Sequence, residues 1–137
     1  MSGMIHATGR TRTYAIAGVA GLIVVVALWA WLRPSAARMR GSTDELMDRL
    51  IAARPDQRDD LIVELGRRGP QVIPQATAAY ETAAHDPDLR SQLATVIFRT
   101  NDPAQAIPAL ERLLQQENHP DVRRTLENYL AGLRRPR

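Results

Sequence analysis

The sequence predicts an all-α protein in which a single transmembrane helix precedes a short array of about five to six helices. Three observations carry this prediction. Residues 14–32 form an uncharged, largely apolar run. The motif Pro-Asp-x-Arg begins at Pro55, Pro87 and Pro120, at intervals of 32 and 33 residues. No later segment alternates apolar and polar residues with the two-residue period of a strand. A repeat of this length is typical of stacked helix pairs, each of which covers the apolar stripe of the next.

The run from Tyr14 to Leu32 is long enough to cross a bilayer. As a helix it spans roughly 28 Å, close to the ~30 Å thickness of the hydrocarbon core. Tyr14, Trp29 and Trp31 suit the two headgroup interfaces, and Arg33 marks a border. No Asp, Glu, Arg or His lies inside the run, so we expect no proton relay, ion path or cofactor ligand there.

Small residues inside the run would let a second membrane helix approach closely. They are Ala17, Gly18 and Gly21. Ordinary use of Ala and Gly in a membrane span is an equally good interpretation.

The segments beside the run give the organisation and the orientation. Residues 1–13 are an N-terminal tail and residues 33–42 a linker. Two Arg precede the run and four follow it within about 20 residues, so the positive-inside rule favours a repeat domain in the cytoplasm. The margin is narrow, and the opposite orientation, with the domain in the periplasm, stays open. A cleaved signal peptide is a further alternative, because Ser35-Ala36-Ala37 offers small residues for cleavage. The length of the run and its two Trp favour a retained anchor.

The repeat domain is expected to begin with a capped helix. Ser42 followed by Glu45 forms a capping box, and Leu46, Met47, Leu50 and Ile51 share one face of the helix that stops before Pro55. Later helices are expected at about 55–68, 71–84, 87–100, 103–117 and 120–133. Asp86 and Asp102 would cap the two that begin at Pro87 and Pro103.

Several segments resemble HEAT repeats of the short bacterial type. They are Asp86-Pro87-Asp88-Leu89-Arg90, Ala106-Ile107-Pro108-Ala109-Leu110 and His119-Pro120-Asp121-Val122-Arg123, and the resemblance covers about residues 43–134. It implies an α-solenoid that serves as a protein-binding scaffold. It also implies that the repeated acids and bases form a structural ladder between neighbouring helices. These residues are Asp56, Arg58, Asp88, Arg90, Asp121 and Arg123.

The charge is unevenly divided along the chain. Residues 1–40 contain five Arg and no acid, whereas residues 41–137 contain thirteen Arg and fifteen acids. A nearly neutral domain argues against nucleic-acid binding. The helices that open with the repeated motif begin with acids and end with bases, which suits the helix dipole. Because these helices would run parallel, we also expect a basic edge that faces anionic headgroups or an acidic partner. Its residues are Arg67, Arg68, Arg99, Arg134, Arg135 and Arg137. Residues 135–137 form a basic C-terminal end that follows the repeat domain.

No catalytic, cofactor-binding or metal-binding residues are predicted. The chain has no Cys and no glycine-rich phosphate loop, and its three His lack metal-ligand spacing. Ser91 lies near His85 and Asp88 in sequence but has no nucleophile elbow.

The sequence therefore predicts a non-catalytic scaffold in the inner membrane of a bacterium, most simply an accessory or assembly subunit of a membrane complex. Its expected partners are other subunits and the bilayer, without nucleic acid, cofactor or small-molecule substrate. The alternatives are a free-standing adaptor that recruits a soluble protein, or a HEAT-like enzyme.

Overall fold

The computed structural model describes residues 40–136, and within them the chain is entirely helical. Six α-helices and two short 3-10 helices (η) are present, without a strand in this range. This confirms the predicted all-α fold class for this part of the chain. The elements are α2 (Thr43–Ala52), η1 (Pro55–Gln57), α3 (Asp59–Arg67), η2 (Pro70–Val72), α4 (Ile73–Thr82), α5 (Pro87–Arg99), α6 (Pro103–Gln116) and α7 (Pro120–Arg134).

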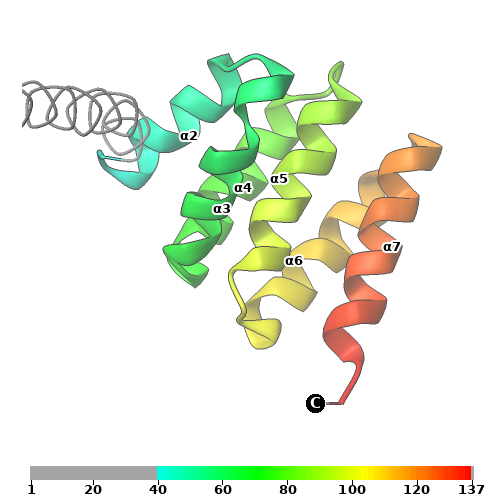
Figure 1. Ribbon diagram of the computed structural model, residues 1–137. Helices are drawn as coiled ribbons and strands as arrows, with labels where there is room; N and C mark the ends of the chain where they lie inside the picture. The colour runs from blue at the N-terminus through cyan, green and yellow to red at the C-terminus, as the bar shows by residue number, and fades with distance from the viewer. Residues whose placement is uncertain (1–39, 137) are drawn as a thin grey trace, which may run out of the picture. The chain divides into compact units, whose positions relative to one another are not determined.

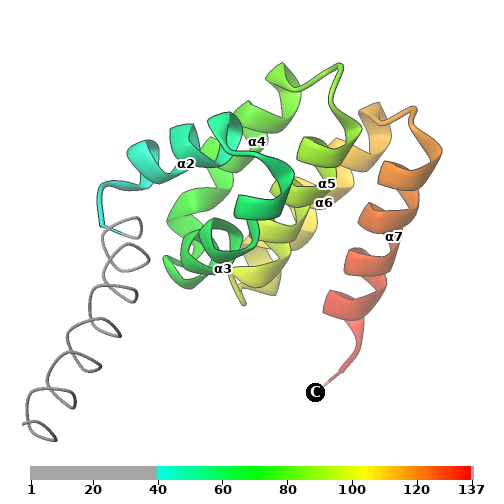
Figure 2. The same cartoon turned by 45° about the horizontal axis from the view of Figure 1, so that its top comes forward.

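Five of the six helices form two layers. α3, α5 and α7 lie side by side in one layer and run in the same direction, while α4 and α6 run back in the other (Figure 1). The remaining helix, α2, packs against α3 and α4. Each helix of the first layer packs on the helix that precedes it in the sequence, which gives the pairs α2–α3, α4–α5 and α6–α7. The view in Figure 2 shows the same succession from α2 to α7. The packing between layers and along each layer makes one compact unit from Gly41 onward.

The predicted helix starts are confirmed at three places. Ser42 and Glu45 form both hydrogen bonds of the capping box at α2. The carboxylates of Asp86 and Asp102 accept from the backbone N–H of Leu89 and Gln105, at 2.9 and 3.2 Å. These bonds satisfy N–H groups that have no partner inside the helix. Each of the corresponding helices therefore begins where the sequence indicates.

The helix predicted over residues 55–68 is divided in the structure. A 3-10 turn covers Pro55–Gln57, and the α-helix begins only at Asp59. Arg54 occupies the N-cap position of the turn and makes no side-chain cap. Its long cationic side chain cannot accept a hydrogen bond as the Asp residues do at α5 and α6, so this turn begins without a side-chain cap.

The core is aliphatic and lies between the two layers. Its fully buried large side chains come from every α-helix except α4, whose buried residues are Ile73, Ala76, Thr77, Ala79 and Tyr80. Ile51 lies at the margin of the apolar face of α2 and is 42 % exposed, whereas Leu46, Met47 and Leu50 of that face are buried. It lines a shallow surface pocket together with residues of α4.

The predicted membrane residues fall outside the described part of the chain. They are Tyr14, Ala17, Gly18, Gly21, Trp29, Trp31 and Arg33. Among residues 40–136, no helix has the length and apolar character needed to cross a bilayer.

Candidate functional site

A buried polar junction joins three helices at the end of α6. Glu117 is only 3 % exposed. Its carboxylate accepts a short hydrogen bond from the hydroxyl of Tyr80 on α4 and another, at 2.8 Å, from the backbone N–H of His119. A guanidinium nitrogen of Arg90 on α5 lies 3.4 Å from the same carboxylate. Burying a charge is unfavourable unless such partners replace water, and here three groups from different parts of the fold meet at one carboxylate.

The junction shifts the pKa of both acidic groups in it. Burial raises the pKa of Tyr80, and its hydrogen bond to Glu117 and the negative charge there raise it further, against the opposing effect of Arg90. Burial alone would raise the pKa of Glu117, but bonds from Tyr80 and the His119 N–H, with the charge of Arg90, lower it overall. Glu117 is thus a fixed carboxylate with its oxygens engaged. Its contacts hold these elements together.

The repeated arginines also make internal contacts. Arg58 is 6 % exposed and donates to the carbonyl oxygen of Ala53 and to the side chain of Gln92 on α5, both at 2.9 Å. Arg123 donates to the carbonyl oxygens of Leu114 and Glu117 at 3.1 and 2.8 Å. The arginines therefore bind the exposed carbonyl ends of preceding helices and connect neighbouring units.

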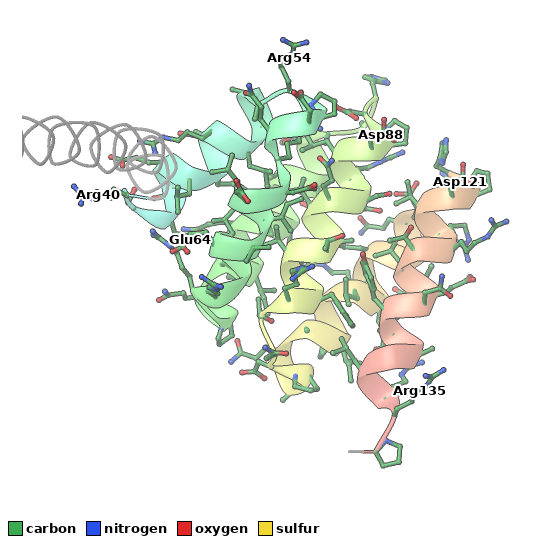
Figure 3. All side chains as sticks on the ribbon, viewed as in Figure 1. Arg40, Arg54, Glu64, Asp88, Asp121 and Arg135 are labelled. Atoms are coloured by element: carbon green, nitrogen blue, oxygen red, sulfur yellow. The ribbon has the colours of Figure 1, made fainter. Side chains whose placement is uncertain are left out.

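The repeated aspartates lie elsewhere. The carboxylate of Asp56 is 3.9 Å from Arg54, and both side chains are strongly exposed. Within residues 40–136 no hydrogen bond or ion pair is formed by the side chains of Asp88 and Asp121, which stand at the same edge as Arg54 (Figure 3). The structure thus brings Arg58 and Arg90 across to neighbouring units, but places none of the three aspartates against an arginine of another unit.

The residues of the predicted basic edge divide into two groups. Figure 3 places Arg135 at the edge opposite to Asp88 and Asp121. Arg68 is held by Glu64 at 3.7 Å and by Thr43 at 3.4 Å, and Arg134 is paired with Glu111. In contrast, Arg67, Arg99 and Arg135 are exposed and have no ion pair or hydrogen bond with any residue of the described range. Arg137 lies outside that range.

A groove of about 760 Å³ crosses the layer formed by α3, α5 and α7. Two of the exposed arginines line it, together with an aromatic pair. Its lining residues are Val63, Gly66, Arg67, Thr95, Phe98, Arg99, Thr100, Asn101 and Tyr129. The rings of Phe98 and Tyr129 are stacked, with centroids 4.4 Å apart, and the Tyr129 hydroxyl is 2.7 Å from that of Thr95. These contacts fix the aromatic wall in place.

Gly66 explains how closely the helices approach below the groove. A Cβ atom at Gly66 would lie 2.6 Å from the Cβ of Arg99, which is nearer than real Cβ contacts allow. α3 and α5 therefore meet at their ends with no room for a side chain between them. This contact places Arg67 and Arg99, which end these two helices, next to one another at the surface.

The groove and the buried junction were not predicted from the sequence. A signal for the groove exists, since Arg67 and Arg99 both lie 12 residues after the Pro of their motif, and Gly132 has that position in α7. Glu117 gives no such signal, because its partners come from residues 80 to 119 and meet only in the folded chain.

No metal site is found in the described range, where no three His, Asp or Glu side chains are grouped to hold an ion. The described residues define a class, an all-α domain built from adjacent helix pairs. Comparisons with protein families, with curated proteins and with solved structures give no match.

Proposed function

We propose that the protein is a non-catalytic, membrane-anchored scaffold, and that it serves as an accessory or assembly subunit of a bacterial membrane protein complex. Residues 14–32 would be its anchor, and residues 43–134 a short HEAT-like α-solenoid held near the bilayer by the linker 33–42. The domain is proposed to lie in the cytoplasm.

The observation that carries this proposal is the division of polar side chains in the helical domain. The buried ones, such as Glu117 and Arg58, are engaged in contacts that join helices. Those without an internal partner, such as Arg67 and Arg99, line an open groove on a surface shared by three helices. Internal polar groups thus support the framework, and the external ones are free for contacts. That distribution fits a binding surface better than a catalytic pocket, in which titratable groups with perturbed pKa converge on a cavity.

Purification from the native membrane tests this proposal. A tagged full-length chain, extracted in mild detergent, should run on native gels as a defined complex whose other subunits are identified in constant ratio by mass spectrometry. A soluble protein that washes off with salt would indicate a free-standing adaptor instead. A chain that purifies alone at every detergent concentration would contradict both forms of the scaffold proposal.

The anchor and its orientation are tested separately. The absence of native Cys allows a single reporter thiol, Arg135→Cys, on the intact chain. A membrane-impermeant maleimide should label it only after the inner membrane is opened if the domain is cytoplasmic. Labelling of intact spheroplasts would place the domain in the periplasm. Extraction of the chain by alkaline carbonate would show that it is not an integral membrane protein.

A further inference from the structure

Arg67 and Arg99 are not needed to cap the helices that they end. The last carbonyl oxygens of α3 accept from the backbone N–H of Arg68 and Gly69, at 3.1 and 3.2 Å. At the end of α5, the carbonyl of Ile97 accepts from both the N–H and the hydroxyl of Thr100, at 3.3 and 2.8 Å. The two guanidinium groups make no hydrogen bond to these ends in the described structure. The helix dipole explains why a positive charge is favoured at each of these helix ends. It does not explain why both arginines line the same groove.

Two positive charges line one groove, and no acidic side chain lines it with them. Gly66 brings the ends of α3 and α5 together, so both exposed arginines belong to the same part of the surface. Their charge favours an anionic ligand, most strongly at low salt. The planar donor forks of Arg match the two oxygens of a carboxylate or the oxygens of a phosphate.

The aromatic wall distinguishes the kinds of anion. Phe98 and Tyr129 are partly exposed and stacked against each other, and they lie in the same groove as the two arginines. A phospholipid headgroup at a flat bilayer surface would meet the arginines but would leave such a recessed wall unused. A peptide segment presents a carboxylate and an apolar side chain at the same time, and the volume of the groove is in the range of sites that enclose ligands.

The N-terminal segment of the same chain is a poor candidate for the groove. Residues 1–40 contain five Arg and no acid, so their charge has the same sign as that of the groove. The occupant that fits the charge of the groove is therefore an acidic segment of another protein.

We propose that this groove binds an acidic peptide segment of a partner protein. One carboxylate is held between Arg67 and Arg99, and an apolar or aromatic side chain nearby in the segment packs on Phe98 and Tyr129. This inference rests on the proposed scaffold function and defines the chemistry of the segment that the scaffold recognises.

The test is a selection of random displayed peptides on the full-length protein in nanodiscs of neutral phosphatidylcholine. Selected peptides should contain Asp or Glu close to an apolar or aromatic residue. Their affinity, measured by fluorescence anisotropy, should fall about tenfold in the double variant Arg67→Ala/Arg99→Ala, since each exposed ion pair contributes a few-fold. It should also fall as salt is raised. Alanine keeps the Cβ of Arg99 against Gly66, so the variant should fold, which thermal unfolding verifies.

The matched control is Arg54→Ala/Arg124→Ala, which also removes two exposed positive charges. Arg54 stands at the opposite edge of the domain, and neither residue lines the groove. Affinity should change less than about twofold in this variant. Equal losses in the two variants would mean non-specific charge attraction and would overturn the proposal. Failure to enrich any peptide, or enrichment of peptides without acidic residues, would do the same.

Two further results would assign the groove to another occupant and overturn the proposal. One is protection of α3 and α5 from hydrogen exchange in phosphatidylglycerol nanodiscs that is lost in the groove variant, which indicates lipid. The other is self-association that the same variant abolishes, which indicates a second copy. The scaffold proposal is tested independently of the groove. If Arg67→Ala/Arg99→Ala still enters the native complex and binds peptide as the wild type does, only the inference about the groove fails.

Discussion

Replacement of Glu117 by Gln should lower the free energy of unfolding by about 2 to 3 kcal/mol. The substitution keeps the size of the side chain but removes its charge. The 3.4 Å ion pair with Arg90 is lost, and the side chains of these two residues are 16 % and 1 % exposed, so water cannot fully replace it. The Nε atom of Arg90 is already buried without a partner. The variant thus leaves a largely buried cation uncompensated, which is the costly way to break such a pair.

The measurement is urea unfolding of the full-length chain in mild detergent, followed by circular dichroism. Glu127→Gln is the matched control, because its 3.9 Å pair with Arg123 joins side chains that are 57 % and 43 % exposed. It should cost less than about 0.5 kcal/mol. If the two variants unfold at the same urea concentration, the argument that Glu117 holds the helices together is refuted.

The pH dependence gives a second reading of the same variant. Because folding lowers the pKa of Glu117 below its ordinary value of 4.5, the unfolded chain binds the extra proton first as the pH falls. The stabilisation by Glu117 is therefore complete above pH 4.5 and is lost as the pH falls through the folded pKa. The difference in unfolding free energy between the wild type and Glu117→Gln should narrow in that window. A difference that stays constant would contradict the lowered pKa.

Three further substitutions test the fold. In the wild type, folding raises the pKa of Tyr80 above 10, so the unfolded chain loses this proton first as the pH rises. The free energy of unfolding should therefore decline above pH 10 by up to about 1.4 kcal/mol per pH unit, and this decline should be absent in Tyr80→Phe. Equal slopes of the two proteins in urea titrations at alkaline pH would contradict this. Gly66→Ala should cost about 1 to 3 kcal/mol because its Cβ would collide with Arg99, and chemical denaturation measures it. Gly69→Ala should cost a similar amount for a different reason, because its φ of 82° and ψ of −163° are essentially restricted to glycine, while the space around it is open. Gly69→Asn should be as destabilising as Gly69→Ala, since Asn tolerates positive φ in the left-handed helical region and not at this ψ; a wild-type stability in either variant would reject the conformational explanation.

The sequence predicted those features of the fold that depend on nearby residues. The capping box at Ser42 and the N-caps at Asp86 and Asp102 join residues three positions apart, so their sequence patterns are sufficient to place helix starts. Apolar spacing indicates which residues share a face of α2 but not how deeply each is buried, so the 42 % exposure of Ile51 could not be predicted from it. The cap position does not predict the division of the helix after Pro55, because α7 also begins without a side-chain cap and is α-helical from Pro120.

The candidate site could be predicted only in part. Arg67 and Arg99 were placed on a basic edge from their position at helix ends, and the structure adds that they line a groove with Phe98 and Tyr129. The aromatic contact joins residues 31 positions apart, and its existence depends on the packing of α5 against α7. The Glu117 junction depends in the same way on long-range geometry. No local pattern shows that a carboxylate after an ordinary amphipathic helix will be buried.

The parallel course of α3, α5 and α7 makes the composition of the groove adjustable one unit at a time. Arg67, Arg99 and Gly132 hold the same place in their respective units, and a Cβ on Gly132 would make only an ordinary 3.5 Å contact with the ring of Phe98. Replacement of Gly132 by Arg would therefore add a third positive charge to this row without any change in the aliphatic core. The surface that contacts a ligand and the stability of the fold depend on different side chains, so each can change in evolution without the other.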